Sequence, residues 1–194
     1  MRAVRRLARH ELRLFAGLAL WAARRTHGTG GGGQAFGYAR GQGVVMAGLA
    51  VVCVIETLTM SVLLRRWPVP HAVMLFLDVY TVALVVALHA SSVVRPHVLT
   101  GDCLRVRHAA HVDLRVPLTA VASVRREPRT THGRTDGELD VPVGSRTSVT
   151  VELTAPVTHV TLLGRRRDVR VIRFHAEEAE GLVRTLSTLA RNAT

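Results

Sequence analysis

The sequence is poor in the residues that build most catalytic, metal-binding and redox sites. It contains no lysine, only two cysteines and 4% aromatic residues in a chain of 194. Cys53 and Cys103 lack the spacing of a zinc site or of a redox pair, so we expect two reduced thiols. The ten histidines form no HExxH motif, and no serine lies in a nucleophile elbow. We therefore expect no catalytic residues, no metal and no cofactor, and a protein that is not an enzyme.

All 26 basic residues are arginine, which we ascribe to coding bias, and the net charge of +12 is unevenly distributed. Residues 1–42 carry eight arginines against one acid, residues 43–95 three against two, and residues 96–194 fifteen against eleven. A nucleic-acid binder would concentrate its charge in a folded domain and add aromatic side chains for stacking. Neither feature is found, so we expect no nucleic acid partner.

Two long apolar runs dominate the first half of the chain. Residues 43–64 and 69–94 both reach the roughly 20 residues that a helix needs to cross the hydrocarbon core of a bilayer. Residues 65–68 separate them and suffice only for a tight turn. The pattern predicts a transmembrane helical hairpin over residues 43–94, with the lipid bilayer as a partner.

Charge on either side of the runs predicts the orientation of this hairpin. Six arginines lie in its two flanks and two in the connecting loop, where Trp67 fits an interfacial anchor. The positive-inside rule then places both termini in the cytoplasm of a multi-pass plasma membrane protein.

Residues 1–25 have the pattern of a basic amphipathic helix. Arg2, Arg5, Arg9 and Arg13 lie near one helical face, and apolar side chains lie near another. Such a helix lies at the membrane interface, its arginines attracted to anionic lipid. Two other interpretations stay open: a signal peptide, because a short apolar core follows the basic start, and an ordinary solvated helix.

Residues 26–42 are rich in glycine and are expected to form a flexible linker. Gly28, Gly30 and Gly33 satisfy GxGxxG, but no strand precedes them and a run of glycines matches that pattern trivially.

One carboxylate falls within each apolar run. Glu56 and Asp78 lie at a similar distance from the connecting loop, so an antiparallel hairpin would bring them to a similar depth. A carboxylate costs a few kcal/mol at mid-span, which a shared proton or a hydrogen bond would reduce. Three roles stay open: a contact that sets the register or joins a homo-oligomer, recognition of a membrane-protein partner, and conduction.

Beyond Arg95 the periodicity changes from helical to alternating, which predicts strands. We expect an α+β protein in which residues 95–194 form a small antiparallel β domain capped by a C-terminal helix. The expected strands are residues 97–100, 103–108, 112–118, 147–153, 157–163 and 169–175, with a long exposed loop over 128–146 and the helix over 176–191.

Four segments resemble the bacterial pleckstrin-homology-like domains. Residues 95–107 (RPHVLTGDCLRVR), followed by 114–118 (LRVPL) and 121–124 (VASV), look like the opening of these domains, and residues 174–183 are similar to their last strand and helix. Domains of this family commonly follow paired membrane helices. The resemblance implies a binding or assembly module, and it supplies no catalytic residues.

Arg165, Arg166 and Arg167 lie in the turn between the last two expected strands. They are either a solvated basic turn or a contact for lipid headgroups or an acidic partner. We expect a membrane-anchored interaction or scaffolding protein. The alternatives are a sensor of anionic lipid headgroups and an accessory subunit of a membrane transporter complex.

Overall fold

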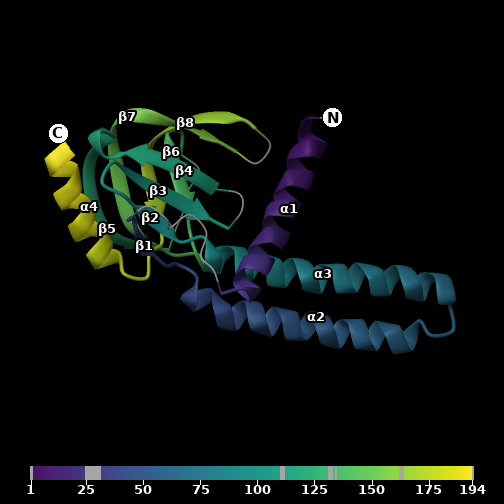
Figure 1. The fold of residues 1–194 in the computed structure, drawn as a ribbon. Coiled ribbons are helices and arrows are strands. Elements are labelled where there is room, and N and C mark those ends of the chain that lie inside the picture. Colours follow the sequence, from purple (N-terminus) through teal and green to yellow (C-terminus); the bar gives the residue numbers. More distant parts are fainter. Residues whose placement is uncertain are drawn as a thin grey trace.

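The structure is a computed structural model that describes residues 2–24, 32–109, 112–130, 133, 135–161 and 164–193, with the backbone alone for residues 2–10 and 13. It is an α+β protein with two parts, a helical hairpin and a sheet domain (Figure 1). The two chain ends lie away from the tip of the hairpin (Figure 1).

The hairpin consists of helices α2 (Gly43–Leu63) and α3 (Pro68–Val94), which run antiparallel side by side. Pro68 begins α3, where its missing N–H requires no partner within the helix. Near the turn, Ser61 Oγ and His71 Nε2 are hydrogen-bonded at 2.8 Å. This bond fixes which residues of α2 and α3 lie at the same level. The prediction of two long apolar helices is confirmed, and each is long and apolar enough to cross a membrane.

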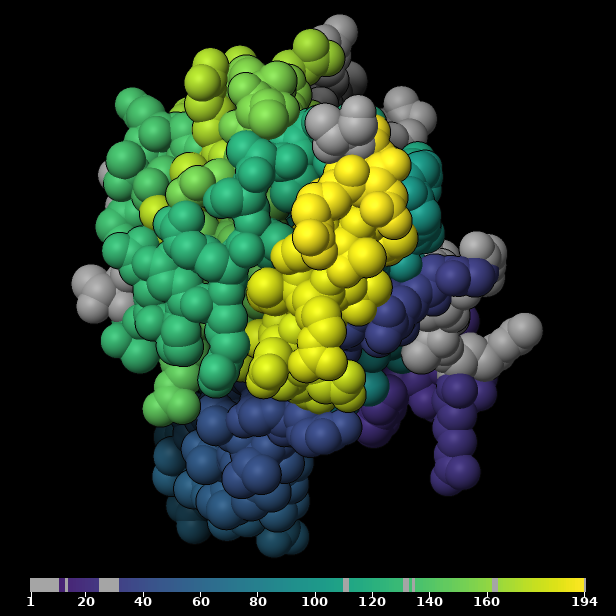
Figure 2. Space-filling view, turned by 90° about the vertical axis from the view of Figure 1, so that its left-hand side faces the viewer, coloured from purple at the N-terminus to yellow at the C-terminus, as the bar shows by residue number. Residues whose placement is uncertain are grey.

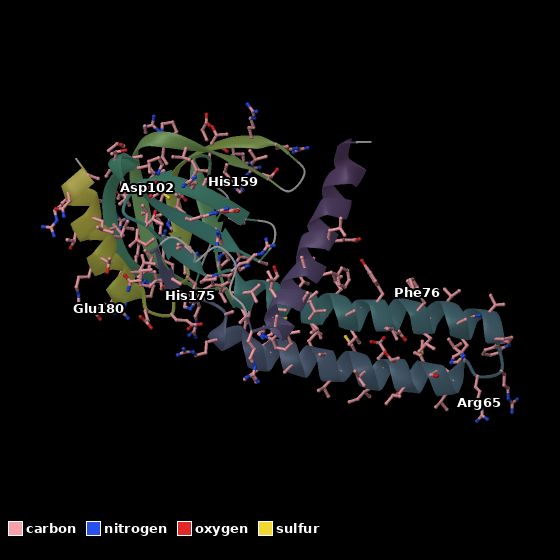
Figure 3. All side chains as sticks on the ribbon, viewed as in Figure 1. Arg65, Phe76, Asp102, His159, His175 and Glu180 are labelled. Atoms are coloured by element: carbon pink, nitrogen blue, oxygen red, sulfur yellow. The ribbon has the colours of Figure 1, made fainter. Side chains whose placement is uncertain are left out.

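Most of the hairpin surface is apolar. Phe76 is 70% exposed and lies on the side of α3 away from α2, while Arg65 lies at the far end of the hairpin (Figure 3). Only the last turns of α3 are buried, at Ala87, Ala90 and Val94, where α1 and the sheet domain cover them.

Helix α1 (Arg2–Ala22) packs across α3 (Figure 1). Leu14 is buried in a cluster with Ala87, and Gly17 comes so close to Ser91 that a Cβ atom would lie 3.2 Å from the Ser91 Cα. Predicting a helix here was correct, but its contact with α3 was not anticipated. The side chains of Arg2, Arg5, Arg9 and Arg13 lie outside the described part of the structure.

The sheet domain contains two four-stranded sheets, with strand orders β1-β2-β3-β4 and β5-β7-β8-β6. Every neighbouring pair is antiparallel except β6 and β8, which are parallel. The strands are β1 (Gln34–Phe36), β2 (His97–Leu99), β3 (Cys103–His108), β4 (Val112–Pro117), β5 (Val121–Arg129), β6 (Glu138–Val141), β7 (Thr147–Val160) and β8 (Arg166–Phe174), with short 3-10 turns η1 (Arg40–Gln42) and η2 (Leu118–Ala120).

Both sheets and the C-terminal helix α4 (Ala179–Ala193) enclose one hydrophobic core. Leu104 and Val116 enter it from the first sheet, Val151 and Ile172 from the second, and Leu182 from α4, all with no exposed surface. Burial of this apolar surface is the main stabilising contribution to the domain. The helix covers an open side of the sheets, as the sequence predicts.

Four expectations were wrong, three about segment boundaries and one about an entirely antiparallel domain. The expected linker over 26–42 contains β1, because Phe36 joins the core and Gln34 pairs with Leu99. The expected loop over 128–146 contains β6, paired with β8. The strands expected at 147–153 and 157–163 are a single strand, β7, whose pairing is irregular between Glu152 and Val157, the usual mark of a β-bulge. The parallel β6–β8 pair makes the second sheet mixed.

Candidate functional site

The segment between α1 and α2 fastens the sheet domain to the hairpin. The Tyr38 ring is buried and lies against His97 and His108, with ring centroids 4.8 and 5.5 Å away. Its hydroxyl oxygen accepts a hydrogen bond from the Ala109 backbone N–H at 2.8 Å. Burial raises the pKa of Tyr38 to about 12, so the phenol stays neutral at physiological pH.

His97 is the centre of this junction, and both of its ring nitrogens are occupied. Nε2 donates to the His175 carbonyl oxygen at 2.9 Å, and Nδ1 accepts from the Arg107 backbone N–H at 3.1 Å. Burial lowers the pKa of His97 to about 4, and the ring is neutral. A histidine held in this way has no free nitrogen for a metal ion or a proton transfer, so we assign it a structural role.

A second connection joins η1, which precedes α2, to the turn that precedes α4. The Arg40 backbone N–H donates to Glu177 Oε1 at 2.6 Å, and Arg40 Nε lies 3.4 Å from Glu177 Oε2. The Glu177 N–H in turn donates to the Gly37 carbonyl oxygen at 2.9 Å. The hairpin and the domain are therefore connected through side chains as well as through the chain itself.

Glu56 and Asp78 lie at the similar depth that their sequence positions predict, since the Ser61–His71 bond places Glu56 about level with residue 76. They do not form a pair in the described part of the structure. Asp78 faces inward, with its Oδ2 buried and without a hydrogen-bond partner, whereas Glu56 is exposed on α2. The two carboxylates therefore share a similar depth without contacting each other in the described part of the structure.

Arg165, Arg166 and Arg167 are all exposed at the end of the β7–β8 hairpin. Arg166 and Arg167 already belong to β8, paired with Val160 and His159, so only Arg165 lies in the turn. This end projects beyond the sheets in the direction in which the helical hairpin extends (Figure 1).

Helix α4 lies on the surface of the domain beside β5, an edge strand of the second sheet (Figure 2). Two hollows lie between this strand and the helix, and together we call them the groove. The larger, about 640 Å³, is lined by Arg126, Arg146 and the first turn of α4. The smaller, about 310 Å³, continues along β5 beside Ala122 and Ser187. Sequence reasoning missed this groove because strand and helix are more than 50 residues apart.

The part of the chain that the structure describes contains no cluster of three or more His, Cys, Asp or Glu side chains that would hold a metal ion. Cys53 and Cys103 are free thiols. Comparisons with protein-family models, curated proteins and solved structures found no match to this chain.

Proposed function

We propose that the chain is a membrane-anchored, non-enzymatic interaction protein that presents a pleckstrin-homology-like domain at the cytoplasmic face of the plasma membrane. The main support is the contrast between an apolar, outward-facing hairpin and a sheet domain fastened directly to its end. An exposed apolar surface of this extent favours lipid contact over water.

The groove between β5 and α4 is the surface best suited to a partner. An edge strand leaves backbone N–H and C=O groups on its outer side, and an extended peptide can pair with them. Arg126 and Arg146 line the larger hollow, and no ion pair is seen for either within the described residues. Glu177, Glu178 and Glu180 line the same hollow, so it contains side chains of both charges. We therefore propose an extended segment as the partner, bound beside β5 through backbone hydrogen bonds to the edge strand.

Site-specific photo-cross-linking in native membranes tests this proposal. Ala122 and Ala155 are both exposed alanines of the same sheet, but only Ala122 lines the groove. A photoreactive residue at 122 should yield a discrete cross-linked species that is lost with Arg126→Ala, and one at 155 should not. Equal cross-linking at both positions, or none at position 122, would contradict the groove assignment. Release of the chain from membranes at alkaline pH would contradict the anchoring.

Headgroup binding by the end of the β7–β8 hairpin is a second candidate function, favoured by its three exposed arginines and by the direction in which this end of the ribbon projects (Figure 1). The full chain in neutral nanodiscs and in nanodiscs with phosphatidylglycerol would be compared by hydrogen exchange. Anionic lipid should slow exchange at residues 164–168, and replacing Arg165, Arg166 and Arg167 with glutamine should abolish the difference. Identical exchange in both lipids would exclude this role.

A further inference from the structure

One face of α2 presents a heptad pattern to the outside of the hairpin. Its members recur at alternating spacings of four and three residues, and all are exposed. We call this set the Glu56 face; it consists of Val45, Leu49, Val52, Glu56, Thr59 and Leu63.

Glu56 is the one charged residue of this face, and contact with lipid would not account for a carboxylate at this position. Its side chain is exposed, and its own hairpin supplies no hydrogen bond or ion pair for it within the described residues. In the proposed membrane it would face hydrocarbon near mid-span, where carboxylates almost always face protein or water. Something outside the hairpin must therefore cover it.

We propose that a second copy of this chain covers it, through parallel packing of the two α2 helices along the Glu56 face. This inference rests on the proposed membrane anchoring. Two copies inserted with the same topology are related by a two-fold axis along the membrane normal. Each residue of one α2 then lies level with the same residue of the other, so Glu56 meets Glu56 of the second copy.

The pattern around Glu56 fits a two-stranded contact. In parallel coiled coils a single polar residue in an otherwise apolar seam fixes register and oligomer state, at some expense of stability. Two carboxyl groups that share one proton can form a hydrogen bond with each other. Thr59, one turn away, donates its hydroxyl to its own Ile55 carbonyl oxygen at 2.9 Å, and its oxygen can still accept a hydrogen bond.

The position of α1 leaves this approach open. Helix α1 packs on α3, with Tyr80 donating to Glu11 at 2.9 Å and Leu14 beside Ala87. In Figure 1 most of α1 lies on the side of α3 away from α2, and only its last turns cross α3 toward the start of α2. A second α2 can therefore pack against the first without displacing α1.

Disulfide cross-linking of the full chain in proteoliposomes tests the geometry. In a Cys53→Ser background, Val52→Cys lies on the Glu56 face and Val54→Cys on the opposite flank of α2, where Val54 lines a groove with α3. Both valines are exposed, at 59% and 44%. Oxidation should join two chains through position 52 and leave position 54 monomeric. Equal cross-linking, none at either position, or a preference for position 54 would overturn the proposal.

Resonance energy transfer between labelled chains, measured as lipid is added, tests the role of the carboxyl. A polar contact between transmembrane helices corresponds to roughly a three- to thirtyfold change in the dissociation constant. Glu56→Leu should weaken association by about that factor, Glu56→Gln by less, and Val54→Leu not at all. A Glu56→Leu variant that associates as tightly as the parent would overturn the proposal.

Failure of this inference is distinguishable from failure of the anchoring. A chain that resists alkaline extraction and yet stays monomeric at every lipid ratio is anchored but does not self-associate. A different membrane protein found cross-linked at position 52 would likewise overturn self-association and assign the Glu56 face to that protein.

Discussion

The hairpin and the sheet domain distribute apolar side chains in opposite ways. In the domain, Leu104, Val151 and Leu182 are fully buried. In the hairpin, the large apolar side chains of α2 point outward, and Asp78 and the Ser61–His71 bond lie between the helices. Among the described large hydrophobic residues that are exposed, only Val160 belongs to the sheet domain. This distribution suits a domain surrounded by water and, in the proposed membrane, a hairpin surrounded by lipid.

Leucine-to-alanine substitutions in the two parts should show the largest difference in their effect on stability. Leu182 is buried in the domain core and Leu58 is 63% exposed on α2. Leu182→Ala leaves a cavity and should lower the free energy of unfolding by about 2–5 kcal/mol. Leu58→Ala should have little effect, since the side chain is exposed and its removal leaves no cavity. Hydrogen exchange of β7 amides in the reconstituted chain measures both, and equal losses would contradict the comparison.

Acid should weaken the junction between the two parts. His97 has a pKa of about 4 in the folded chain, whereas an unfolded histidine has one near 6.5. Below about pH 6.5 the unfolded chain therefore takes up a proton that the folded chain refuses until about pH 4. Stability should fall by about 3 kcal/mol across this window as the pH falls. His159 and His175, whose pKa values burial also lowers, add to the slope.

Thermal unfolding of the full chain in detergent between pH 7 and pH 4 measures this effect. His97→Gln keeps one acceptor and one donor without a titratable ring, so its stability should depend less steeply on pH. An unchanged slope in His97→Gln would contradict the assignment to His97.

Breaking the ion pair between β6 and β8 should produce a moderate loss confined to the domain. Arg173 donates to Glu138 at 2.6 and 2.8 Å and to Asp140 at 3.3 Å, and the residue is 8% exposed. Arg173→Met removes these bonds and leaves both carboxylates without it, at a loss of about 1.5–3 kcal/mol. Arg165→Met, in the exposed turn, is the control and should leave stability unchanged. Hydrogen exchange of β6 amides reports both.

The smallest effect is expected between the hairpin helices. Ser61→Ala removes the 2.8 Å hydrogen bond to His71. Hydrogen bonds between transmembrane helices average about 0.6 kcal/mol, because the separated helices also find partners. A double-mutant cycle with His71→Ala, measured by reversible unfolding in mixed micelles, isolates this contribution. A coupling as large as the loss in Arg173→Met would show that the hairpin is held together in the same way as the domain.

Long and strongly periodic segments could be predicted from the sequence. The bounds of α2 and α3 agree with prediction to within about a residue, because runs of more than 20 apolar residues leave no competing structure. Strands β3 and β4 follow from the alternation of apolar and charged residues between Cys103 and Pro117.

Short segments that pair with residues distant in the sequence could not be predicted. Strand β1 has three residues in a glycine-rich context, and only Phe36 among them is buried. Strand β6 pairs with β8 more than 30 residues later, and this is the one parallel pair among the described strands. The contact of α1 with α3 joins residues more than 60 positions apart, such as Leu14 with Ala87 and Gly17 with Ser91. The groove between β5 and α4 requires the tertiary fold, since neither element has an unusual sequence.

The path from α3 into the sheet domain has a mechanical consequence. Only Arg95 and Pro96 separate the last turn of α3 from β2, and Pro96 disfavours a helical conformation at Arg95, where α3 ends. With Tyr38 and the Arg40–Glu177 contact as further attachments, the domain has little freedom to swivel. In the proposed membrane, a helix tilts to match the thickness of the surrounding bilayer. The height and angle of the β5–α4 groove above the lipid would then vary with bilayer thickness, so the groove would be presented differently in thick and thin regions of the same membrane.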